Sequence, residues 1–150
     1  MKRSPSEQRL EQMLRSSKLA AGGFMGTDTR TAEEVIREDA AELERLGKTA
    51  AAVASRMRKL AQLARPALGN WIETEDKYRV RSEEWKGSLI CPWPHAGRYE
   101  KRITTCRRLD TDQEIEWADL TIHLIEAHGF FEGRGSAFRL DPADLVRILF

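Results

Sequence analysis

Both cysteines and all three histidines of this 150-residue chain lie between Cys91 and His128. Thiolates and imidazoles are the ligands that zinc prefers in proteins. A single zinc site built from them would require a fold that brings the two ends of this segment together. The first cysteine precedes a loop with two prolines and a glycine, and the last histidine ends an apolar stretch.

Short extended segments are predicted for residues 77–80 and 88–91, and a longer one for 99–109, where side chains alternate in character. Prolines and a glycine separate the last two, which indicates a hairpin with a wide loop. Its two strands carry Cys91 and Cys106.

A helix is predicted from about residue 112 to His128, because apolar residues recur along it and Gly129 is suited to a left-handed C-terminal cap. This helix carries His123 and His128 near its end. A hairpin with two thiols followed by a helix with two imidazoles can close a tetrahedron around one ion.

In this order of residues the segment 89–129 resembles a C2H2 zinc finger, including Leu120 three residues before the first histidine. Fourteen residues separate the cysteines, a longer loop than is usual for the family. The resemblance implies a β-hairpin and helix around one structural Zn²⁺, with the ligands Cys91, Cys106, His123 and His128.

His95 is an alternative ligand. The run Cys91-Pro92-Trp93-Pro94-His95 could supply two ligands by itself, so that His95 replaces Cys106. A third interpretation has no metal, with two buried or paired cysteines and ordinary core histidines.

The first 66 residues are predicted to be helical and to form a possible coiled-coil arm. Ser4 can cap a helix over residues 5–20, and Thr31 with Glu34 forms a capping box at the start of a long helix. Gly47 could break or bend that helix. A seam of apolar residues at heptad-like steps follows it: Ile36, Leu43, Leu46, Ala50, Val53, Met57, Leu60 and Ala64.

Packing within the chain and a homodimer through residues 31–65 are both compatible with this seam. Pro66, Gly69 and Asn70 mark the expected boundary with a small α+β zinc-binding domain of residues 67–150. That domain should end in a helix capped by Asp141.

Two glycine-rich segments, residues 22–28 and 129–136, are predicted to be loops. A phosphate-binding role for the first is disfavoured because no strand precedes it. Phe130 and Phe131 in the second are expected to fill the core.

Basic residues suggest a nucleic-acid partner. Residues 45–65 hold six lysines and arginines and no acid. Cations interleaved with aromatic side chains suit phosphates and unstacked bases. The hairpin cations near Trp93 and Tyr99 are therefore candidates for such contacts: Arg98, Lys101, Arg102, Arg107 and Arg108. The alternative is a solvated hairpin face balanced by nearby acids.

An enzyme is not expected. His123 and His128 are five residues apart, whereas the zinc peptidase motifs place two histidines four apart on one helical face. No apolar stretch is long enough to span a membrane, which indicates a cytoplasmic protein. The sequence thus predicts an α+β, zinc-stabilised, non-catalytic binding or scaffolding protein with a nucleic-acid or protein partner; a metal-dependent hydrolase is the second alternative.

Overall fold

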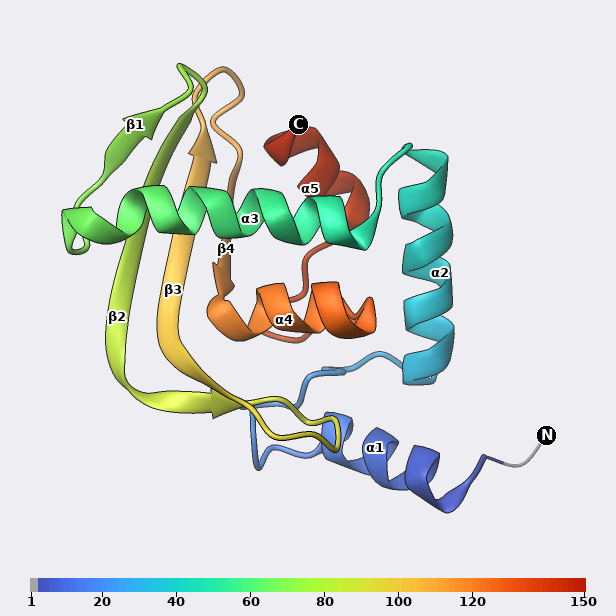
Figure 1. Ribbon diagram of the computed structural model, residues 1–150. Coiled ribbons are helices and arrows are strands. Elements are labelled where there is room, and N and C mark those ends of the chain that lie inside the picture. Colours follow the sequence, from blue (N-terminus) through green and yellow to red (C-terminus); the bar gives the residue numbers. More distant parts are fainter. Residues whose placement is uncertain (1–2) are drawn as a thin grey trace.

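The computed structural model describes residues 3–150 and has a four-stranded antiparallel sheet with helices packed against it (Figure 1). The strands follow one another in the sheet in chain order: β1 (Ile72–Thr74), β2 (Tyr78–Ile90), β3 (Arg98–Arg108) and β4 (Glu114–Ala118). The helices are α1 (Pro5–Arg15), α2 (Ala32–Arg45), α3 (Ala50–Ala64), the short 3₁₀ turn η1 (Arg65–Ala67), α4 (Asp119–His128) and α5 (Pro142–Leu149). The expected α+β class is confirmed.

The expected long helix of residues 31–65 is wrong, because the chain turns sharply between α2 and α3 (Figure 1). Gly47 takes a left-handed conformation with φ 71°. Its N–H donates to Glu44 O, and the N–H of Lys48 donates to Leu43 O, which together form a Schellman cap. Thr49 then caps α3 by accepting from the N–H of Ala52.

The expected helix of residues 112–128 is also wrong in its first part. Residues 114–118 form β4, which pairs with β3, and α4 starts only at Asp119. Ile115 and Trp117 alternate with two glutamates and pack into the core. Alternation with a period of two is typical of a strand, and pairing with β3 stabilises the strand over a helix.

The hairpin is longer than predicted. The predicted segments 77–80 and 88–91 lie at the two ends of one strand, β2, which includes all their residues except Lys77 and Cys91 and pairs with β3. A register shift between Trp85 and Ser88 interrupts the ladder, and Gly87 lies there with φ 105°. This polar, bulged stretch carries little apolar alternation, so its strand character depends on pairing with β3.

Two cores fill the molecule. The main core lies between the sheet and helices α3, α4 and α5, and it joins Met57 and Leu60 of α3 to Tyr78 and Trp117 of the strands. Side chains from both sides of residue 66 thus share one core. The seam residues Val53, Met57, Leu60 and Ala64 are fully buried there.

The second core connects α1, the loop after it, α2 and α4. Leu14, Met25, Val35, Leu124 and Phe130 are its fully buried members. None of the helices within residues 3–150 has both the length and the apolar character that crossing a membrane would require. The cap expected at Asp141 is confirmed by its bond from the N–H of Ala143.

Candidate metal centre

Four side chains converge at the edge of the second core: Cys91, His95, His123 and His128. One ligand atom from each lies within 4.8 Å of every other. The Nε2 atom of His95 is 3.2 Å from the Nε2 atoms of both His123 and His128, and Cys91 Sγ is 3.5 Å from His128 Nε2. This group could hold a metal ion.

Three local structures position these residues. Cys91 directly follows the last residue of β2, and His95 lies in the loop between β2 and β3, next to Pro94. His123 lies in the middle of α4. His128 is the last residue of that helix, where Gly129 ends it in the left-handed conformation predicted from the sequence.

Cys106, expected as a ligand, is not a member of the cluster. It lies in the middle of β3, with Val80 and Ile115 as its neighbours on the adjacent strands. Its side chain is fully buried in the main core, and burial raises the pKa of its thiol to about 12. His95 occupies the place in the cluster that Cys106 was expected to take, as in the alternative drawn from the sequence.

Three of the six separations among the ligand atoms match those of a tetrahedral zinc site, and the other three are within 4.8 Å. With Zn–N of about 2.05 Å and Zn–S of about 2.3 Å, tetrahedral geometry requires roughly 3.3 Å between two nitrogens and roughly 3.6 Å between sulfur and nitrogen. The measured values are 3.2 Å and 3.5 Å. One Cys and three His side chains could therefore bind one ion with little rearrangement.

A hydrogen bond prepares His95 for coordination. Its Nδ1 lies 3.0 Å from the carbonyl oxygen of Ala96, which can only accept. The proton therefore sits on Nδ1, and the lone pair of Nε2 faces the other two imidazoles. A cation shared by the three imidazoles could occupy the space that these nitrogens face.

Aromatic rings enclose the cluster. The imidazole of His128 stacks on Trp93, Tyr99 stacks on His123 at 4.5 Å between ring centroids, and Phe130 meets Trp93 edge-on. Burial, and next the neighbouring His123 and His95, lower the pKa of His128 to about 4. Burial likewise lowers the pKa of His123, with His95 adding to the effect. The imidazoles of His123 and His128 are thus kept in the neutral form that binds metals.

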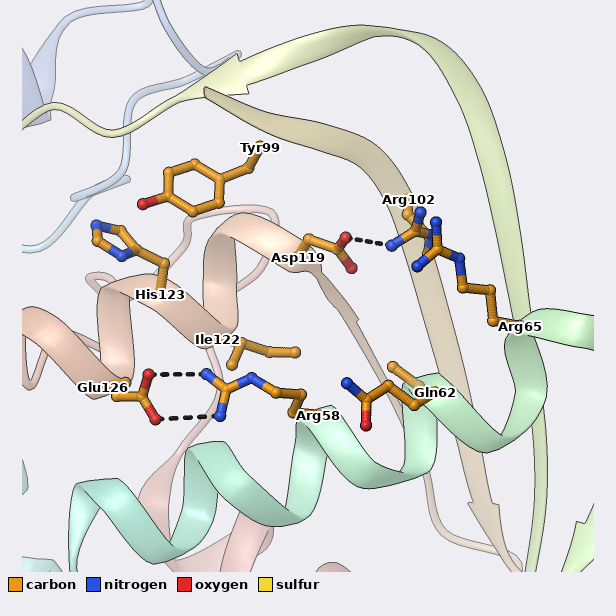
Figure 2. A pocket seen from close by; sticks show the side chains of 10 residues that line it. Arg58, Gln62, Arg65, Tyr99, Arg102, Asp119, Ile122, His123 and Glu126 are labelled. Carbon is orange, nitrogen blue, oxygen red and sulfur yellow. Dashed lines mark hydrogen bonds and ion pairs between the residues drawn. The ribbon is translucent and has the colours of Figure 1, made fainter. Parts of the chain in front are cut away.

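A cleft of about 360 Å³ adjoins the cluster between α3, α4 and β3 (Figure 2). His123 and Tyr99 belong to its wall as well as to the surroundings of the cluster. Ion pairs lie at two of its sides: Arg58 binds Glu126 through two hydrogen bonds, and Arg102 binds Asp119 at 2.7 Å. Sequence reasoning missed this cleft, because its residues come from three separate elements.

The five hairpin cations proposed for nucleic-acid binding differ in their burial and in their ion pairs. Arg102 is buried, bonded to Asp119, Glu84 and Glu100. Arg107 pairs with Glu114, and Arg108 binds Asp110 and two carbonyl oxygens of α5. Arg98 and Lys101 are exposed.

Comparisons of this chain with protein-family models, curated proteins and solved structures found no match. The cluster differs from the C2H2 pattern, because it holds one thiol and three imidazoles rather than two of each.

Proposed function

We propose that this protein is a non-catalytic binding protein stabilised by one Zn²⁺ that Cys91, His95, His123 and His128 hold. The convergence of the four ligand atoms within 4.8 Å supports this proposal most directly, and three of their separations match a tetrahedral shell. A thiolate with three imidazoles is a borderline-soft donor set, which suits zinc and disfavours magnesium or calcium.

The ion would connect the loop after β2 to the end of α4. The loop has two prolines, and in the described residues 3–150 its one backbone–backbone hydrogen bond lies inside the loop, from His95 N–H to Trp93 O. Metal coordination would strengthen the link between loop and helix that Trp93 makes by stacking on His128. The zinc is therefore structural, and its binding energy contributes to folding.

Four protein ligands support a structural rather than a catalytic zinc. A catalytic zinc keeps three protein ligands and leaves a position for water, whereas structural sites are closed by four. The internal ion pairs of Arg102, Arg107 and Arg108 favour a protein or small-molecule partner over nucleic acid. Salt-dependent nucleic-acid binding relies on cations that are free to contact phosphates.

Elemental analysis of the purified protein tests the metal assignment. One zinc per chain is expected in the wild type and in Cys106→Ala, and the zinc should be lost in Cys91→Ser and His95→Ala. Circular dichroism of each variant separates loss of ligand from loss of fold. A folded Cys106→Ala protein without zinc, together with a His95→Ala protein that retains it, would overturn the ligand set.

A metal-dependent hydrolase is the second candidate, favoured by the cleft that shares His123 with the cluster. Cobalt substitution distinguishes the two. A closed site gives a tetrahedral Co²⁺ absorption spectrum that added acetohydroxamate leaves unchanged. At a site with an exchangeable water, acetohydroxamate displaces the water and changes the spectrum.

A further inference from the structure

The two glycine-rich loops predicted from the sequence lie against each other. We call residues 22–28 and 129–136 the paired loops. The N–H of Thr27 donates to Arg134 O at 2.9 Å, and the N–H of Gly133 donates to Phe24 O at 2.8 Å. The carboxylate of Asp28 also accepts from the N–H of Arg134. Segments more than a hundred residues apart are thus joined backbone to backbone.

Glycine is required where the paired loops cross. A Cβ on Gly26 would lie 2.3 Å from the backbone nitrogen of Ser136, and one on Gly133 would lie 2.3 Å from the carbonyl oxygen of Met25. No side chain fits at such distances. The crossing therefore holds the backbone around Glu132 in one fixed path.

Glu132 has an unusual conformation and environment. Its φ is 68°, a left-handed value that costs a residue with a Cβ about 1 kcal/mol or more. Its side chain is buried, and Ser136 Oγ, which donates to Oε1 at 3.1 Å, is the one hydrogen-bond partner of the carboxyl group in the described residues 3–150. Strained, buried ionisable residues are typical of functional sites.

A cavity of about 270 Å³ contains Glu132 in its wall. The rest of the wall is mostly apolar, with Leu19, Phe24, Leu89, Leu120 and Phe138 as the large side chains. A dry cavity of about 150 Å³ is large enough to bind benzene. This one can therefore take an aromatic or branched aliphatic group with a short polar extension.

Among residues 3–150, no cation forms an ion pair with the Glu132 carboxylate. Arg139 lowers its pKa through charge, but its guanidinium is bonded to both carboxylate oxygens of Asp39 and to the backbone oxygen of Glu132. Lys101 lines the same cavity but is itself exposed. Burial raises the pKa of Glu132 to about 7, although Ser136 and Arg139 oppose the rise.

We propose that this cavity binds a small apolar amine, whose body contacts Leu19, Phe24 and Phe138 and whose ammonium pairs with the Glu132 carboxylate. An ammonium would complete the counter-charge that Arg139 supplies only in part. A buried ion pair recovers the cost of desolvation where its geometry is good and further hydrogen bonds satisfy both groups. This inference goes beyond the proposed zinc site and does not depend on it.

Titration of the purified protein with 2-phenylethylamine tests the proposal, with 2-phenylethanol as the neutral analogue and 3-phenylpropionate as the anion. At pH 8 the amine should bind at least tenfold more tightly than either analogue, and NMR shifts should concentrate on residues of the cavity wall. Glu132→Gln should remove that preference, so that the amine and the alcohol bind about equally.

Two further variants keep the result interpretable. Glu33→Gln changes an exposed glutamate of α2 and should bind the amine like the wild type. Ala137→Trp, at an exposed position of the cavity wall, should block all three ligands even if Glu132→Gln fails to fold. Equal binding of amine and alcohol, or amine binding that survives Ala137→Trp, would overturn the proposal.

Discussion

The imidazole of His128 lies flat on the indole of Trp93, with ring centroids 4.0 Å apart and planes inclined by 8°. Trp93 is in turn held edge-on by the buried Phe130. The indole therefore fixes the ring plane of His128 and, with it, the direction of its Nε2 lone pair toward Cys91 and His95.

The first prediction concerns this stack. Trp93→Ala should weaken zinc binding by about tenfold, because residues that orient a ligand typically contribute 10- to 100-fold to metal affinity. Competition with a chromophoric chelator measures the affinity. The zinc content at saturation should stay at one per chain, because all four ligands remain.

Trp85→Ala is the matched control, since Trp85 is an exposed tryptophan of β2 far along the strand from Cys91. Its zinc affinity should equal that of the wild type. A similar loss of affinity in both variants would show that the effect of Trp93 is not specific to the stack.

The sequence was sufficient to predict where the candidate site lies, but not which residues form it. The density of Cys and His residues between 91 and 128 indicated a metal centre, and Gly129 correctly indicated where α4 ends. Cys106 could not be excluded, because the burial of a strand residue depends on its neighbours in the sheet. Once Val80 and Ile115 flank it, its thiol belongs to the core.

In the fold, too, local features could be predicted from the sequence, whereas features that depend on tertiary packing could not. Caps at Ser4, Thr31 and Asp141 are local and were predicted correctly. The strand β4 was mistaken for helix, because residues 114–118 acquire their extended conformation from pairing with β3. The break at Gly47 was visible in the sequence, but whether it bends or ends a helix depends on what the two halves pack against.

Removing the metal should loosen one region rather than unfold the chain. Zinc at a large excess over its dissociation constant contributes about 4 kcal/mol, so a chelator should lower Tm by about 10 °C in a chain of this size. Hydrogen exchange should quicken in residues 91–97 and at the end of α4. Amides of α3 and β3 should stay protected, because the main core does not include the cluster.

Exchange that accelerates equally across all elements after chelation would contradict this localised role. Readdition of zinc should restore both Tm and protection, whereas magnesium should restore neither, because it prefers oxygen ligands.

The crossing of the paired loops predicts a position that is intolerant of any side chain. Gly133→Ala should cost about 3 kcal/mol or more, because its Cβ would meet the backbone of Met25 and neither loop can move without losing hydrogen bonds. Gly22→Ala is the control: its φ is 75°, but nothing lies within 4 Å of the new Cβ, so only about 1 kcal/mol of backbone strain is expected. Urea denaturation gives both free energies of unfolding, and equal losses would argue against steric contact as the cause.

The buried Glu132 predicts that stability falls as pH rises. Its pKa is about 7 in the folded chain, raised above the ordinary 4.5 mainly by burial. Between these values the folded state holds the proton more tightly than the unfolded state, so the contribution is fully present below about pH 4.5 and is lost as pH rises through 7. The loss is about 3 kcal/mol for this one group, since each pKa unit corresponds to about 1.4 kcal/mol.

Glu132→Gln, which stays neutral, should be more stable than the wild type at pH 8 and should have a flatter stability profile from pH 5 to 8. Glu33→Gln should keep the wild-type slope. Urea denaturation of the three proteins across this range measures the slopes, and parallel profiles for wild type and Glu132→Gln would show that this carboxyl group is not the one responsible.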